Sequence, residues 1–174
     1  MSGYTCKTCG QYHEGLPLSY GSPAPAFVYS LTEKEQRNRV WLSSDQCEVR
    51  GEKFFDEKHY FIVGNIHIPI IDSTEIFNWS VWVSLSKENY KRASKLWNKT
   101  GREKEPPYFG WLSTSLSAVY PETLNLKTNV HTQPVGIRPF IELEPTDHPL
   151  AIEQRNGITM SRVQEIAELV LHPK

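Results

Sequence analysis

Cysteine is scarce in this chain, and neither sign of charge dominates it. The 174 residues include only three cysteines, 19 Lys and Arg stand against 20 Asp and Glu, and the formal net charge is −1. Three cysteines are too few for a disulfide framework and instead suggest metal binding or free thiols. Because there is no basic excess, the chain lacks the electrostatic attraction that drives nucleic-acid binding, and we expect no nucleic-acid partner.

Long apolar segments are also missing. No run approaches the roughly 18 apolar residues that a membrane-spanning helix needs. The opening sequence MSGYTCKTCG has neither the charged start nor the apolar stretch of a secretory signal. We therefore expect no membrane partner and a cytoplasmic location.

What the chain does contain is sufficient for a core, with 39% hydrophobic and 11% aromatic residues. A chain of this length should bury about two-thirds of its unfolded surface. We expect a single domain over residues 4–171, in which residues 4–26 pack as an N-terminal loop or zinc knuckle on the main body. Within this segment, residues 14–26 are rich in Pro, Gly and Ser, which is typical of a loop. Strand and helix patterns follow each other irregularly, which predicts an α+β fold with a mostly antiparallel sheet and flanking helices.

Strands are indicated by apolar residues that alternate with polar ones. The clearest case is FNWSVWVSLS, in which Trp79 falls on the apolar side and Trp82 on the polar side. The expected strand segments are 40–42, 47–50, 54–70 with a bend at Gly64-Asn65, 77–86, 108–116, 124–132 and 137–144.

Helix starts are indicated by capping residues. Thr32 and Glu35 form a capping-box pattern before a short helix at 32–39, and Ser86 precedes a helix that we expect to end at Gly101. Two further helices should close the chain, one capped by Asp147 and one opened by a second capping box at 161–164.

The most specific local motif is Cys6-x-x-Cys9-Gly10. A two-residue spacer lets two thiolates face one metal ion, and the glycine relaxes the turn. Zinc needs four ligands in a structural site, so we expect Cys47 as the third and His13 as the fourth. His59, His67 and His148 are the alternative nitrogen donors. The competing interpretation is a loop with free thiols, whereas a thioredoxin-like redox pair is disfavoured because no helix starts at the motif.

A second group of polar residues suggests chemistry less strongly. His131 and Arg138 fall on neighbouring expected strands, and His148 follows Asp147. These side chains could surround a cleft with a general base. The simpler interpretation is that Asp147 caps a helix and that His131 lies on a solvated sheet face. The sequence contains no nucleophile elbow, phosphate-binding glycine loop or HExxH motif.

Several aromatic residues are candidates for a protein interface. Trp82 lies on the polar side of its strand, and Tyr108 and Trp111 follow a Pro-Pro pair. Exposed Trp and Tyr are frequent interface anchors. The alternative is that helices cover the sheet and place Trp82 in the core, where we also expect Trp41, Trp79 and Trp97.

The segments CKTCGQYHEGLP, SSDQC, WSVWVSLS, PPYFGWL, LNLKTNVHTQPVGIRPFIELEPTDHPLAIEQ and NGI appear in order over residues 4–171. Together they resemble the bacterial family called domain of unknown function 2199. The resemblance implies a small intracellular bacterial protein and no defined activity. The family pattern includes the positions of Cys6, Cys9, His13, Cys47, His131 and His148.

Two functions follow from these patterns. The first is a non-enzymatic, zinc-stabilised module that binds another protein, for example an immunity protein or antitoxin. The second is a metal-assisted hydrolase with His131, Arg138 and His148 around a polar cleft. Convergence of those three side chains in one pocket would favour the enzyme.

Overall fold

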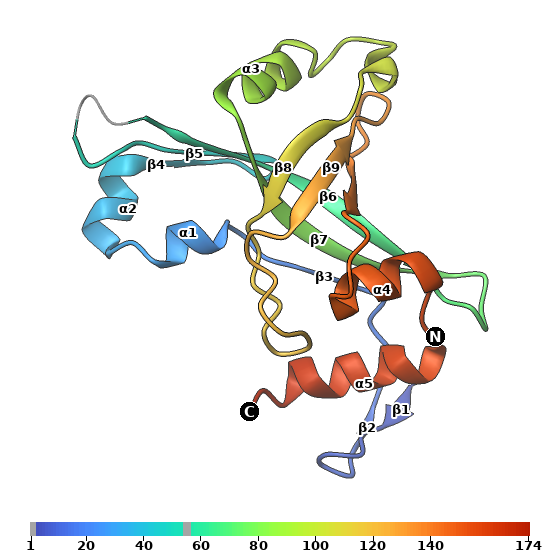
Figure 1. Ribbon diagram of the computed structural model, residues 1–174. Coiled ribbons are helices and arrows are strands. Elements are labelled where there is room, and N and C mark those ends of the chain that lie inside the picture. Colours follow the sequence, from blue (N-terminus) through green and yellow to red (C-terminus); the bar gives the residue numbers. More distant parts are fainter. Residues whose placement is uncertain (1–2, 54–56) are drawn as a thin grey trace.

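The computed structural model describes residues 3–53 and 57–174, and the described chain is organised around one large sheet (Figure 1). Residues 54–56 of the expected strand 54–70 lie outside the described part. The strands are β1 (Tyr4–Thr5), β2 (Tyr12–His13), β3 (Ser19–Gly21), β4 (Val40–Leu42), β5 (Gln46–Val49), β6 (His59–Pro69), β7 (Ile76–Leu85), β8 (Tyr108–Leu112), β9 (Lys127–His131) and β10 (Phe140–Leu143). The helices are α1 (Ala26–Tyr29), α2 (Glu33–Arg39), α3 (Lys87–Lys95), the 3-10 helix η1 (Arg102–Lys104), α4 (Pro149–Asn156) and α5 (Met160–Leu171).

The main sheet closes on itself. Its strand order is β3-β7-β8-β9-β10-β6-β5-β4, and β6 also pairs with β7, so that β6 to β10 form a five-stranded barrel. The α+β class is confirmed. The sheet is mixed rather than mostly antiparallel, because β3 runs parallel to β7 and β10 runs parallel to β6. Sequence patterns could not reveal these parallel pairings, since alternation along a strand does not depend on the direction of its neighbour.

The longest strand pair in the barrel is the β6–β7 hairpin, which is paired from Tyr60↔Leu85 to Pro69↔Ile76. The strand runs through Gly64 without the bend that we predicted. A Cβ at this glycine would overlap the side chain of Ile141. Gly64 therefore serves close packing against β10, and the N–H of Asn65 donates to the Pro139 carbonyl at 2.9 Å beside it.

Two apolar clusters hold this arrangement. The larger fills the barrel and the space under α4 and α5, and includes Trp79, as predicted. The smaller lies outside the barrel beside α1 and α2 and contains Trp82, which is 1% exposed and donates its indole N–H to the Ser22 carbonyl at 2.9 Å. Trp82 is thus a core residue. Trp41, expected in the core, is 51% exposed on the short strand β4.

The helix starts follow local capping chemistry, but only in part as predicted. Thr32 forms the expected capping box with Glu35, and Ser86 caps α3 by accepting from the N–H of Asn89 at 3.1 Å. The other caps differ. His148, not Asp147, caps α4, and Thr159 caps α5 by accepting from Arg162.

Two further expectations for helix bounds are corrected. Ser161 is already inside α5 and does not open it. Helix α3 ends at Lys95, before the expected Gly101, and Gly101 instead adopts a left-handed conformation in front of η1.

The N-terminal hairpin packs against the C-terminal helix. Figure 1 shows the β1–β2 hairpin below α5, away from the barrel. Tyr4, Cys6 and Ala167 form a small buried cluster between them, with Leu16 packed against it. None of the helices in the described ranges is both long and apolar enough to cross a membrane.

Candidate metal centre

The Cys6-x-x-Cys9 motif forms the turn of the β1–β2 hairpin. Tyr4 pairs with His13 in the antiparallel ladder, and the Cys6 N–H extends the ladder by donating to the Gln11 carbonyl at 2.9 Å. The Gly10 N–H donates to the Cys6 carbonyl at 2.9 Å, and Gly10 has a φ of 71°, which favours glycine. The turn therefore places both sulfurs on one side of the hairpin, as expected for a metal-binding motif.

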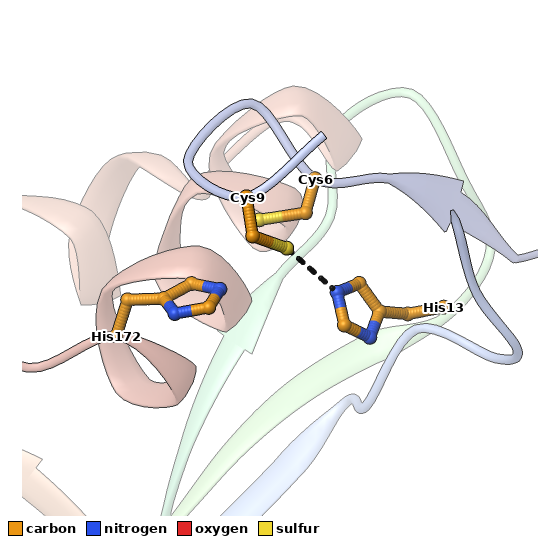
Figure 2. A group of neighbouring side chains, drawn as sticks. All are labelled: Cys6, Cys9, His13 and His172. Atoms are coloured by element: carbon orange, nitrogen blue, oxygen red, sulfur yellow. Dashed lines mark hydrogen bonds between the residues drawn. The ribbon is translucent and has the colours of Figure 1, made fainter. Parts of the chain in front are cut away.

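Four potential metal ligands meet at this turn. They are Cys6, Cys9, His13 and His172, and their ligand atoms all lie within 4.8 Å of one another (Figure 2). The Cys9 Sγ and the His13 Nε2 are 3.5 Å apart. Ligands of tetrahedral zinc are separated by about 3.3–3.8 Å, given bond lengths of about 2.0–2.3 Å. Small side-chain rotations would bring the four groups to that spacing.

His172 completes the group from the other end of the chain. It is the C-cap of α5, and its backbone N–H donates to the Glu168 carbonyl at 3.0 Å. Its Nε2 atom is buried and has no hydrogen-bond partner within the part of the chain that the structure describes. Buried polar atoms are nearly always paired, so such an atom calls for an explanation. A metal ion bound between His172 and the two thiols provides one.

The environment of Cys6 also suits a metal-bound thiolate. Burial raises the pKa of the Cys6 thiol, but the backbone N–H groups of Cys9 and Thr8, together with the Cys9 side chain, outweigh burial and lower it overall. N–H groups directed at sulfur stabilise the thiolate, which is the form that binds metal.

Helix α5 supports the hairpin through two polar side chains. Glu168 Oε1 accepts from the Lys7 N–H at 3.0 Å, and Gln164 Nε2 donates both to the Thr5 carbonyl at 3.2 Å and to Glu168 Oε1 at 2.9 Å. The side chain of Gln164 and the N–H of Lys7 lower the pKa of Glu168, against the effect of its burial. The carboxylate is therefore held in its charged form in the position that fixes the hairpin.

Cys47 is not a member of the ligand group. It lies on β5, is 0% exposed, and packs in the cluster of Val49, Phe61 and Trp82. Burial raises the pKa of its thiol to about 12, so it stays a neutral, apolar side chain. The structure thus does not bring Cys47 to the predicted partners Cys6, Cys9 and His13, because pairing of the strands encloses it among apolar neighbours. The alternative donors His59, His67 and His148 are also outside the group.

The candidate catalytic residues are engaged separately. His131 Nε2 lies 3.3 Å from Glu142 Oε1, and Arg138 donates to Asp45 Oδ1 at 2.8 Å. His148 caps α4, and its Nε2 lies 3.0 Å from the Glu122 carbonyl oxygen. Arg138 lines a cavity that includes neither histidine. The expected polar cleft around these three side chains is therefore not formed.

The proposed interface residues are divided between core and surface. Tyr108 is 5% exposed and points into the barrel core, whereas Trp111 is 41% exposed on the outer face of β8. Phe109 lies beside it, 45% exposed, with the two rings edge to face at a centroid distance of 4.9 Å. The alternation of β8 places Phe109 and Trp111 on one face, a signal that our sequence analysis did not use.

The comparisons with known proteins place the chain in a family. The sequence profile described as an uncharacterised protein conserved in bacteria, DUF2199, matches residues 5–158. The chain belongs to this family. The matched DUF2199 region includes the hairpin with Cys6, Cys9 and His13, but it ends before α5 and His172. No curated protein and no solved structure matches the chain.

Proposed function

We propose that this DUF2199 protein is a non-enzymatic module that binds another protein, and that a structural zinc ion fastens its N-terminal hairpin to α5. The observation that supports the metal site is the meeting of Cys6, Cys9, His13 and His172 around a buried, unpartnered Nε2. Two thiolates and two imidazoles are a common ligand set of structural zinc sites.

The composition of the ligand group favours a structural role over a catalytic one. Catalytic zinc keeps one coordination position for water or substrate, whereas four protein ligands fill a tetrahedral shell. The zinc would join residues from both ends of the described chain. In small zinc-finger peptides such binding contributes about 10–16 kcal/mol to folding. The hairpin has only two short strands and a small apolar cluster, so it would gain most from the ion.

The outer face of β8 and β9 supports the binding role. Phe109 and Trp111 form an exposed aromatic pair, opposite Asn129 and Lys127 on β9. Aromatic residues surrounded by polar side chains are typical of interface centres. An inhibitory partner protein of the immunity or antitoxin type is one form that this role could take.

The metal part of the proposal is tested by elemental analysis of the untagged protein. We expect one zinc per chain, and we expect removal of zinc by a chelator to lower the melting temperature and to be reversed by added zinc. A protein purified without chelators that contains no zinc, and whose melting temperature does not change when zinc is added, would contradict the proposal.

The binding part is tested by affinity capture from the native host with wild-type protein and Trp111→Ala. Tyr29→Ala is the control, because Tyr29 is an aromatic residue that is 59% exposed and lies on α1 rather than on β8. A specific partner should be retained by the wild type and the control and lost with Trp111→Ala. Equal capture by all three proteins would rule out the β8 face as the interface.

A further inference from the structure

A cavity of about 200 Å³ is lined by residues of the barrel strands and of the segment that carries α3 and η1. Figure 1 shows α3 at the opposite end of the molecule from α5 and the β1–β2 hairpin. Its walls are mainly apolar and include Ile62, Leu96, Trp97, Val135 and Ile137. Concave, mainly apolar pockets with a few polar groups are the usual sites for small molecules. The volume suits a ligand the size of a single substituted ring.

One wall of the cavity carries a buried positive charge. Arg102 is 8% exposed, and its guanidinium donates to four backbone carbonyls, those of Trp97 at 2.8 Å, Gln133 at 2.8 Å, Pro134 at 3.1 Å and Ile137 at 3.0 Å. A guanidinium has five N–H donors, so one proton on Nη1 remains for a further acceptor. Within residues 3–53 and 57–174, no carboxylate forms an ion pair with Arg102.

The lining of the cavity also carries an ion pair. Arg138 donates from Nε to Asp45 Oδ1 at 2.8 Å and from Nη2 to the Ser44 carbonyl at 3.2 Å. The ionisable groups of the lining are therefore two guanidiniums and one carboxylate besides the neutral Tyr108. Carbonyl dipoles solvate the charge of Arg102 but do not neutralise it, and a buried arginine remains protonated. The cavity thus has one positive charge in excess.

The geometry points to a binding site for a small apolar monoanion, such as an aromatic or branched aliphatic carboxylate, with the apolar part against Trp97 and Leu96 and the carboxylate toward Arg102 and Arg138. Carboxylates are matched to guanidinium groups by charge and by hydrogen-bond geometry. The apolar ring of the ligand would contact the remaining, apolar part of the cavity wall. This site is independent of the zinc centre and of the β8 face.

The test is a titration of ¹⁵N-labelled full-length protein with 3-phenylpropionate, followed by NMR. The neutral 3-phenylpropionamide and the cationic 3-phenylpropylamine serve as controls of matched shape. We expect shift changes at residues 93–98 and 135–138, and an acid that binds about tenfold more tightly than the amide, as a charge-assisted pair implies. Equal affinity for the acid and the amide, or shift changes only elsewhere, would overturn the assignment.

Two substitutions on the ion pair separate ligand binding from a structural role. Arg138→Gln removes one of the two cations and should weaken binding of the acid several-fold. Asp45→Asn breaks the same ion pair but leaves Arg138 free to pair with the ligand. This variant should therefore bind the acid more tightly. A merely structural pair would make both variants weaker, and that result would count against the site. Arg37→Gln on α2, whose side chain is 70% exposed, controls for the loss of one positive charge and should leave the affinity unchanged.

Discussion

Lys7 donates its backbone N–H to Glu168 Oε1 at 3.0 Å, although 161 residues separate the two in sequence. This bond joins the turn that carries Cys6 and Cys9 to α5, the helix whose C-cap is His172. The turn between Cys6 and Cys9 is therefore held by α5 even before metal binds. Such support of a ligand-bearing segment by outer hydrogen bonds is common in metal sites and tunes their affinity.

Glu168→Ala tests this support directly. Because the Lys7 N–H would lose its acceptor and Gln164 a partner, we expect the melting temperature to fall by several degrees and zinc to bind about 10- to 100-fold more weakly, as is typical for lost outer-shell partners. Differential scanning fluorimetry and a competition titration with a chelator measure the two effects. Glu165→Ala is the matched control, since Glu165 is 60% exposed on the same helix and forms an ion pair with Arg162 at 3.1 Å. If the two variants behave alike, Glu168 does not support the site.

His172→Ala tests the ligand that sequence reasoning missed. Removal of this imidazole opens one of the four coordination positions, so we expect the zinc content of the purified protein to fall clearly below one per chain. If the free energy of unfolding falls by about 2 kcal/mol, we also expect the melting temperature to drop by about 4–8 °C. His67→Ala, at an exposed position on β6, is the control and should retain zinc. Full zinc occupancy in His172→Ala would show that the centre does not need α5.

The members of the candidate ligand group differ in how far the sequence predicts that they meet. Cys6, Cys9 and His13 lie within one hairpin, so their spacing predicts their meeting. His172 reaches the group only through the packing of α5 on the hairpin, and no local spacing records that contact. Cys47 shows the opposite case: its residue type suggested a ligand, but cross-strand pairing with Phe61 encloses it in apolar surroundings.

In the fold as well, some features follow from local sequence patterns and others depend on segments that are distant in the sequence. The alternation of 77–86 correctly places Trp82 on the face opposite Trp79. What covers that face is decided by distant segments, here Ser22 and the apolar cluster beside α1, so the exposure of Trp82 could not be predicted. Barrel closure likewise depends on the pairing of β10 with β6, which joins Phe140 to Asn65, the residue after the glycine where we predicted a bend.

Paired cysteine variants separate a metal role from a packing role. Cys9 is exposed, so Cys9→Ser removes little packing, and loss of zinc in this variant would report on coordination alone. We expect Cys9→Ser to lose zinc and Cys47→Ala to keep one zinc per chain, with only a modest decrease in stability from the small cavity. The zinc content of both proteins, measured side by side, decides the question. Loss of zinc in Cys47→Ala would restore the ligand set that the sequence first suggested.

Alkaline pH should destabilise the fold through its buried phenols. Burial raises the pKa of Tyr20 to about 12 and, together with a hydrogen bond to Glu105, raises the pKa of Tyr108 to about 12. A phenol in the unfolded chain ionises near pH 10. Because the folded-state pKa values are raised, this stabilisation is fully present below about pH 10 and is lost as the pH rises toward about 12.

Urea unfolding at several pH values between about 8 and 11.5 measures this loss, and each buried phenol contributes a slope of at most about 1.4 kcal/mol per pH unit. Tyr20→Phe keeps the ring that packs against Phe77 and Trp79 and removes the ionisable group, so the free energy of unfolding should fall less steeply with pH in this variant. Tyr29→Phe, at an exposed position, should follow the wild type. If Tyr20→Phe has the wild-type slope, the ionisation of Tyr20 does not contribute to alkaline unfolding.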